Sequence, residues 1–71
     1  MRIKSYGKGE LALLYAGDQI MTTQGAINRL NEWIRRNPAL AQALSDSGYQ
    51  IRQKIFTSYQ VRLIVDYLGE P

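Results

Sequence analysis

Four polar side chains recur at intervals of four, three and four residues within the segment 23–36: Gln24, Asn28, Asn31 and Arg35. Because an α-helix repeats about every 3.6 residues, this spacing places all four on one helix face. The amides of Gln and Asn pair with the edge of adenine, and the guanidinium of Arg pairs with guanine or phosphate. The pattern predicts a face that can contact double-stranded DNA, although an ordinary solvated helix face uses the same residue types.

Two arginines flank this face, and one acid lies near it. Arg29 and Arg36 are suited to hold phosphate groups beside the face. The carboxylate of Glu32, by contrast, would repel DNA. The segment therefore supports two interpretations, a recognition helix or plain polar surface.

Positive charge gathers in two separate parts of the chain. Nine Lys and Arg against six Asp and Glu leave a formal charge of +3, with the excess in residues 1–9 and 35–56. A two-stranded β ribbon that pairs residues 2–6 with residues 50–56 would join these parts and resemble the wing of a winged helix, which holds the phosphate backbone. Charged strand edges also discourage aggregation, which is the alternative role. The cations of this predicted ribbon are Arg2, Lys4, Arg52 and Lys54.

Two residue types are missing, and their absence excludes much chemistry. Without Cys or His, the chain lacks a thiolate nucleophile, the usual acid–base group at neutral pH and the commonest metal ligand. Its serines have no His to activate them, and its six carboxylates show no spacing typical of an acid–base pair or a metal cage. We expect a binding protein rather than an enzyme, with no metal and no cofactor.

Start and stop signals predict one mainly α domain over residues 1–71. Gly7 with Glu10, and Thr57 with Gln60, have the spacing of helix N-terminal caps. Together with the ribbon, four short helices would form an arrangement like a winged helix-turn-helix. The predicted helices span residues 8–16, 23–36, 38–46 and 58–68.

Apolar residues at helical spacing identify the core faces of these helices. In the first helix, we expect Leu11, Leu14 and Tyr15 to share one face. The corresponding positions in the later helices are Ala26, Ile27, Leu30, Trp33, Ile34, Leu40, Leu44, Val61, Ile64, Val65 and Leu68.

No segment is apolar enough to cross a membrane. The longest uninterrupted apolar run, Leu11–Ala16, is far shorter than the ~20 residues that span a bilayer. The first residues lead into no signal-peptide hydrophobic region. We therefore expect a soluble, cytoplasmic protein without membrane contact.

Several ordered motifs carry a family resemblance that covers nearly the whole chain. They are KSYGKGELA at residues 4–12, WIRR at 33–36, FTSYQVRLI at 56–64 and LGEP at 68–71. With them, the chain resembles a family of small uncharacterised bacterial proteins, a domain of unknown function. The resemblance implies no activity, substrate or cofactor.

A looser similarity is to MerR-like and excisionase-type DNA-binding domains. Glu10-Leu11-Ala12 followed by a helix that ends in Trp33-Ile34 is similar to their opening, which implies a helix-turn-helix. The connection over residues 17–22 is longer than the tight turn of those domains.

The favoured function is a winged-helix-like DNA-binding accessory or regulator. The helix at residues 23–36 would enter the major groove of double-stranded DNA, and the ribbon would lie on the backbone. The alternative is a protein–protein interaction module or a small homo-oligomer that binds no nucleic acid. In that case the contact surface would be that of the helix at residues 23–36 or that of the last helix, where Tyr59 and Tyr67 would form an exposed aromatic patch.

Overall fold

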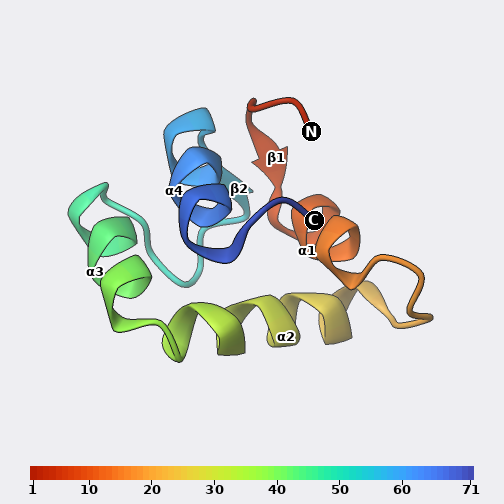
Figure 1. Cartoon of the computed structure of the whole chain (residues 1–71). Coiled ribbons are helices and arrows are strands. Elements are labelled where there is room, and N and C mark those ends of the chain that lie inside the picture. Colours follow the sequence, from red (N-terminus) through yellow and green to blue (C-terminus); the bar gives the residue numbers. More distant parts are fainter.

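Four helices and one pair of very short strands make up the structure, a computed structural model that describes residues 1–71 (Figure 1). In chain order the elements are β1 (Tyr6–Gly7), α1 (Lys8–Ala16), α2 (Thr23–Arg35), α3 (Pro38–Asp46), β2 (Ile55–Phe56) and α4 (Ser58–Leu68). The mainly α class is confirmed. Three helices have the predicted bounds, and α2 ends one residue early: the N–H of Arg36 still donates to the carbonyl of Glu32 at 3.0 Å, but the N–H of Asn37 donates to that of Ile34 at 3.1 Å, which tightens the last turn. None of the helices is both long and apolar enough to cross a membrane.

Side-chain caps fix where α1 and α4 begin. The hydroxyl of Thr57 accepts from the N–H of Gln60 at 3.2 Å, and the Gln60 side chain accepts from the N–H of Thr57 at 3.1 Å. This reciprocal pair is the predicted capping box of α4. Gly7 has no side chain, so α1 keeps only half of such a box, in which the N–H of Gly7 donates to Oε1 of Glu10 at 3.3 Å.

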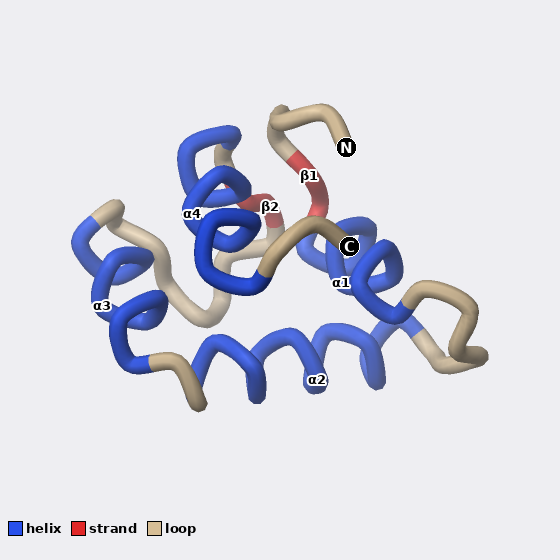
Figure 2. The backbone as a smooth tube through the Cα atoms, in the orientation of Figure 1, coloured by secondary structure: helices blue, strands red, loops and turns tan.

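The predicted ribbon is confirmed, but it is much shorter than expected. β1 and β2 pair antiparallel with Tyr6 opposite Phe56, and they lie between α1 and α4 (Figure 2). One further bond, from the N–H of Lys8 to the carbonyl of Lys54 at 2.8 Å, extends the pairing. A turn just before Lys54 bends the chain out of strand geometry. Two stretches of the predicted ribbon lie outside the strands, residues 2–5 and 50–54.

The β1–α1 and β2–α4 segments repeat one local arrangement. In each, an aromatic strand residue, Tyr6 or Phe56, directly precedes the N-cap of the helix. An apolar residue, Leu11 or Val61, follows in the first helical turn. All four side chains are buried. Such aromatic–apolar pairs fix the angle at which a chain enters its helix. Because the two strands pair, both helix starts contribute to the same core.

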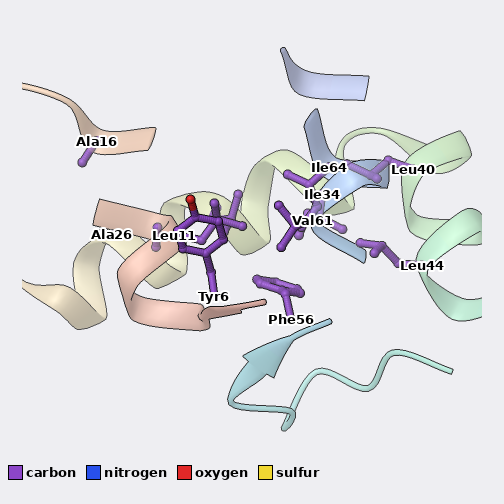
Figure 3. Close-up of a cluster of buried hydrophobic side chains, with 12 residues drawn as sticks. Tyr6, Leu11, Ala16, Ala26, Ile34, Leu40, Leu44, Phe56, Val61 and Ile64 are labelled. Atoms are coloured by element: carbon purple, nitrogen blue, oxygen red, sulfur yellow. The ribbon is translucent and has the colours of Figure 1, made fainter. Parts of the chain in front are cut away.

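The core lies where all four helices meet the strand pair. In Figure 3, Phe56 and Val61 lie between Tyr6 on one side and Leu44 on the other. Phe56 and Val61 are completely buried. The buried hydrophobic residues are Tyr6, Leu11, Ala12, Ala16, Ala26, Leu30, Ile34, Leu40, Leu44, Phe56, Val61 and Ile64.

The buried face of α1 is rotated from the predicted one. Leu14 is 44% exposed, so its assignment to the core was wrong, and Ala12 and Ala16 are buried instead. The reason is the close approach of α2, since a Cβ added to Gly9 would lie 2.6 Å from the Cγ2 of Thr23. Small residues on α1 permit this approach, so the side of α1 that faces α2 becomes buried.

Tyr15 ties the end of α1 to the end of α4. Its hydroxyl donates to the carbonyl of Gly69 at 2.6 Å, and its ring meets Trp33 edge to face at a centroid distance of 6.1 Å. Burial, together with the negative charge of Glu70, raises the pKa of Tyr15 to about 12. The hydroxyl therefore stays protonated in the folded protein after an exposed tyrosine has ionised.

This shift predicts a loss of stability at alkaline pH. Between pH 10 and about 12 the unfolded chain releases the Tyr15 proton while the folded protein keeps it, so the free energy of unfolding should fall as pH rises through this window. In Tyr15→Phe, we expect the decrease in the free energy of unfolding over this pH window to be smaller by about 1 kcal/mol. Urea denaturation at a series of pH values measures it, and Tyr59→Phe, an exposed site, should leave the pH dependence unchanged.

Candidate functional site

A groove runs between the polar side of α2 and the segment 49–54. It consists of a first hollow of about 350 Å³ and a second hollow of about 450 Å³. Asn31 and Ile51 line both hollows, so the two lie next to each other along the groove. The second hollow also reaches the start of α1, at Lys8 and Gly9. The groove thus joins three segments that are distant in the sequence.

The second hollow is lined by cations and by no carboxylate. Its three positive side chains are Lys8, Arg52 and Lys54. Its uncharged polar lining consists of Thr23, Gln24, Asn31 and Gln53. Positive groups that line a concave surface without acids attract anions. The chemistry of this hollow is therefore that of an anion-binding groove.

The predicted polar face of α2 lies along this groove, and three of its four residues are exposed. Nε2 of Gln24 donates to Oδ1 of Asn28 at 2.9 Å, and both side chains, like that of Arg35, remain open to solvent. Asn31 differs, because its Oδ1 is buried without a hydrogen-bond partner. The hydroxyl of Tyr49, across the first hollow, is also buried and unpaired, and burial raises its pKa.

Glu32 offsets two of the arginines on α2. Its carboxylate lies 2.6 Å from Nη2 of Arg35 and 2.8 Å from Nε of Arg36. Hydrogen bonds from Arg35 are the main cause that lowers the pKa of Glu32, and the same contact raises the pKa of Arg35. The acid near the predicted recognition face is thus an ion-pair partner, and it holds Arg35 along the helix surface.

Arg29 lies on the flank of α2 that faces α1. Its guanidinium is 4.8 Å from the ring centroid of Trp33 and donates to the side chain of Gln19. Trp33 in turn contacts Tyr15 on α1. Of the two arginines expected beside the polar face, neither is among the residues that line the groove.

The four cations of the predicted ribbon do not form one surface. Arg52 and Lys54 precede β2, and in an antiparallel pair they lie beside the residues that follow β1. Lys8 follows β1 and is therefore their neighbour. Arg2 and Lys4 precede β1, so the antiparallel register places them toward the other end of the pair. The prediction of one basic ribbon was wrong, and Lys8 takes the place of the two N-terminal cations.

The buried side chain of Gln60 holds the segment 49–54 in place. Gln60 is 3% exposed, accepts from Nε2 of Gln53 at 2.7 Å and donates to Oγ of Ser47 at 3.1 Å. The same oxygen of Gln60 accepts in the α4 cap. One residue thus starts α4 and also anchors a wall of the groove to the end of α3.

Sequence reasoning missed Lys8, Tyr49 and Gln53 as groove residues. Lys8 stood among the N-terminal cations, and nothing local distinguished it from Arg2 or Lys4. Gln53 belonged to the predicted strand at residues 50–56 and Tyr49 preceded it, and only the fold brings them to the groove along α2.

Comparison with known proteins gives one match. A family model described as a domain of unknown function (DUF4248) matches residues 2–71. No curated protein and no solved structure matches the chain. The match agrees with the resemblance carried by the sequence motifs, and it brings no activity with it.

The Gln60 contacts predict a measurable cost if they are removed. Gln60→Leu should lower the free energy of unfolding by about 1–3 kcal/mol, because the partners at Gln53, Ser47 and Thr57 lose their bonds. Amide hydrogen exchange in residues 49–54 should accelerate. Gln50→Leu, at an exposed glutamine, is the matched control and should change neither quantity. Equal effects of the two variants would contradict the anchoring role.

Proposed function

We propose that this chain, which belongs to the family described as a domain of unknown function (DUF4248), binds double-stranded DNA as an accessory or regulatory protein rather than as an enzyme. The outward polar face of α2 would enter the major groove, with Gln24, Asn28 and Arg35 toward the base edges. Arg52 and Lys54, at the rim of the groove, would lie against the phosphate backbone.

One observation carries the proposal. Arg52 and Lys54 lie in the same hollow as Gln24, and no carboxylate lines that hollow. Base-reading amides and backbone-holding cations are the two kinds of contact that a DNA-binding surface combines. The loose similarity to MerR-like domains over α1 and α2 favours the same function. The connection at residues 17–22 separates these helices more than a tight turn does. The angle at which α2 docks on DNA would therefore differ from that of MerR-like domains.

The alternative is self-association or a protein partner through α4. It is favoured by Tyr59 and Tyr67, which are 63% and 45% exposed on that helix. Exposed aromatic side chains of this kind are enriched at protein–protein contacts. Sedimentation of the free protein tests it directly, because association through α4 should be weakened by Tyr59→Ser.

We expect Asn28→Ala combined with Arg35→Ala to weaken binding to a short DNA duplex by at least about tenfold, because both lose contacts to bases or phosphates. Both residues are exposed, so the fold should be unaffected. Fluorescence anisotropy at several salt concentrations measures the affinity, which should fall steeply as salt rises.

The matched control is Arg62→Ala, which removes one positive charge from the exposed surface of α4. It should leave duplex affinity almost unchanged. An equal loss in this control would indicate a general charge effect, and an absence of salt-dependent binding in the wild-type protein would refute the proposed function.

Glu32→Gln should strengthen duplex binding a few-fold at low salt. The change frees Arg35 and Arg36 from their shared ion pair and removes a repulsive charge from α2. The gain should shrink as added salt screens these exposed charges. Asp66→Asn breaks a comparable surface pair on α4, with Arg62 at 3.7 Å, and should give no such gain. Weaker binding by Glu32→Gln would contradict the orientation proposed for α2.

A further inference from the structure

Lys8 is a buried cation without an acidic partner. Only 6% of the residue is exposed, although lysine is almost never fully buried unless it is paired. The four ion pairs of the structure involve the N-terminal amine, Arg35, Arg36 and Arg62, and none involves Lys8. Burial lowers the pKa of its ammonium group. A charge in this environment is unfavourable unless something compensates it.

The surroundings of Lys8 compensate its charge only in part. Its Nζ donates to the carbonyl of Ile51 at 2.8 Å and lies 5.3 Å from the ring centroid of Tyr49. The Tyr49 ring also stacks on the buried Phe56 at a centroid distance of 5.1 Å, so the contact is built on the core. An ammonium has three N–H donors, and the carbonyl takes one of them. The ammonium group of Lys8 is therefore held in position, and its other N–H groups can still donate hydrogen bonds.

The second hollow adds further positive character around this group. Arg52 and Lys54 line it together with the first residues of α1, Lys8 and Gly9. The N–H of Lys8 already donates to the carbonyl of Lys54 and that of Gly7 to Glu10, so the positive character of the hollow comes from its side chains. Every charge at this hollow thus has the same sign, and no acid of the chain lines it.

We propose that the second hollow is a phosphate-binding site in which Lys8, Arg52 and Lys54 together hold one phosphate group. The proposal deepens the proposed function and rests on it for the source of the phosphate, a phosphodiester of the DNA backbone. The same chemistry fits the phosphate of a free nucleotide, which the test separates. In either case the anion supplies the ionic partner that Lys8 lacks.

Lys8→Met tests the site, because methionine keeps the length of the buried stem and removes the charge. For a short duplex, we expect its affinity to be about tenfold lower than that of the wild-type protein, and its log affinity to depend on log salt with a slope shallower by about 0.9. Lys4→Met is the matched control, since it removes an exposed lysine at the other end of the strand pair and should change neither value.

A second variant keeps the test independent of folding. Arg52 is exposed, so Arg52→Gln should leave the fold intact and still weaken duplex binding several-fold. The amide resonances of both variants are compared with those of the wild-type protein to confirm the fold. The same samples are then titrated with inorganic phosphate and with adenosine monophosphate at millimolar concentration.

The outcomes separate the two proposals. If the duplex binds and Arg52→Gln weakens that binding, but Lys8→Met behaves like Lys4→Met, the three-cation phosphate site is refuted and the proposed function stands. If the duplex does not bind but adenosine monophosphate or phosphate shifts the amides at the second hollow, and Lys8→Met abolishes those shifts, the proposed function fails and the phosphate site stands. No response to any of the three probes refutes both.

Discussion

The antiparallel pairing of β1 with β2 is the constraint on which the rest of the molecule depends. It involves only Tyr6–Gly7 and Ile55–Phe56, yet it joins segments that lie some fifty positions apart in the chain. Each strand leads into a capped helix, so the pairing places α1 beside the start of α4 and directs the aromatic strand residues into one core. Two strands this short are marginal by themselves. They persist because Phe56 is completely buried among the helices that they position.

The same register decides the composition of the groove. Because the pairing continues from Lys8 to Lys54 by one backbone bond, the start of α1 is held against the turn that precedes β2. A shift of one residue would turn the strand side chains to the opposite face and take Phe56 out of the core. Gln60 then fixes the turn from its other side through Gln53. Hydrogen bonds to both α1 and α4 therefore hold the wall of the groove that faces α2.

Cations on one side of the groove have an acidic partner, and the buried cation on the other side has none. On α2, the exposed carboxylate of Glu32 offsets Arg35 and Arg36, and such pairs at the surface contribute little to stability. At the start of α1, the nearly buried Lys8 has no acid within ion-pair distance and relies on a carbonyl and an aromatic ring. The net positive charge of the open helix face is thus reduced by an acid, whereas the positive charge of Lys8 inside the hollow has no acid to balance it.

The sequence by itself determined the helices and their ends, because those signals act within one turn of helix. Thr57 with Gln60 and Gly7 with Glu10 mark where α4 and α1 begin, and the bounds of three helices could be predicted from such local residues. The tertiary structure alone decided which face of α1 is buried and which cations meet. Leu14 is exposed because α2 approaches over Gly9, and Arg2 and Lys4 lie away from Arg52 because the strand register brings Lys8 there instead. Helix rotation and strand register are set by packing between distant segments, and one-dimensional spacing contains no information about which distant segments will meet.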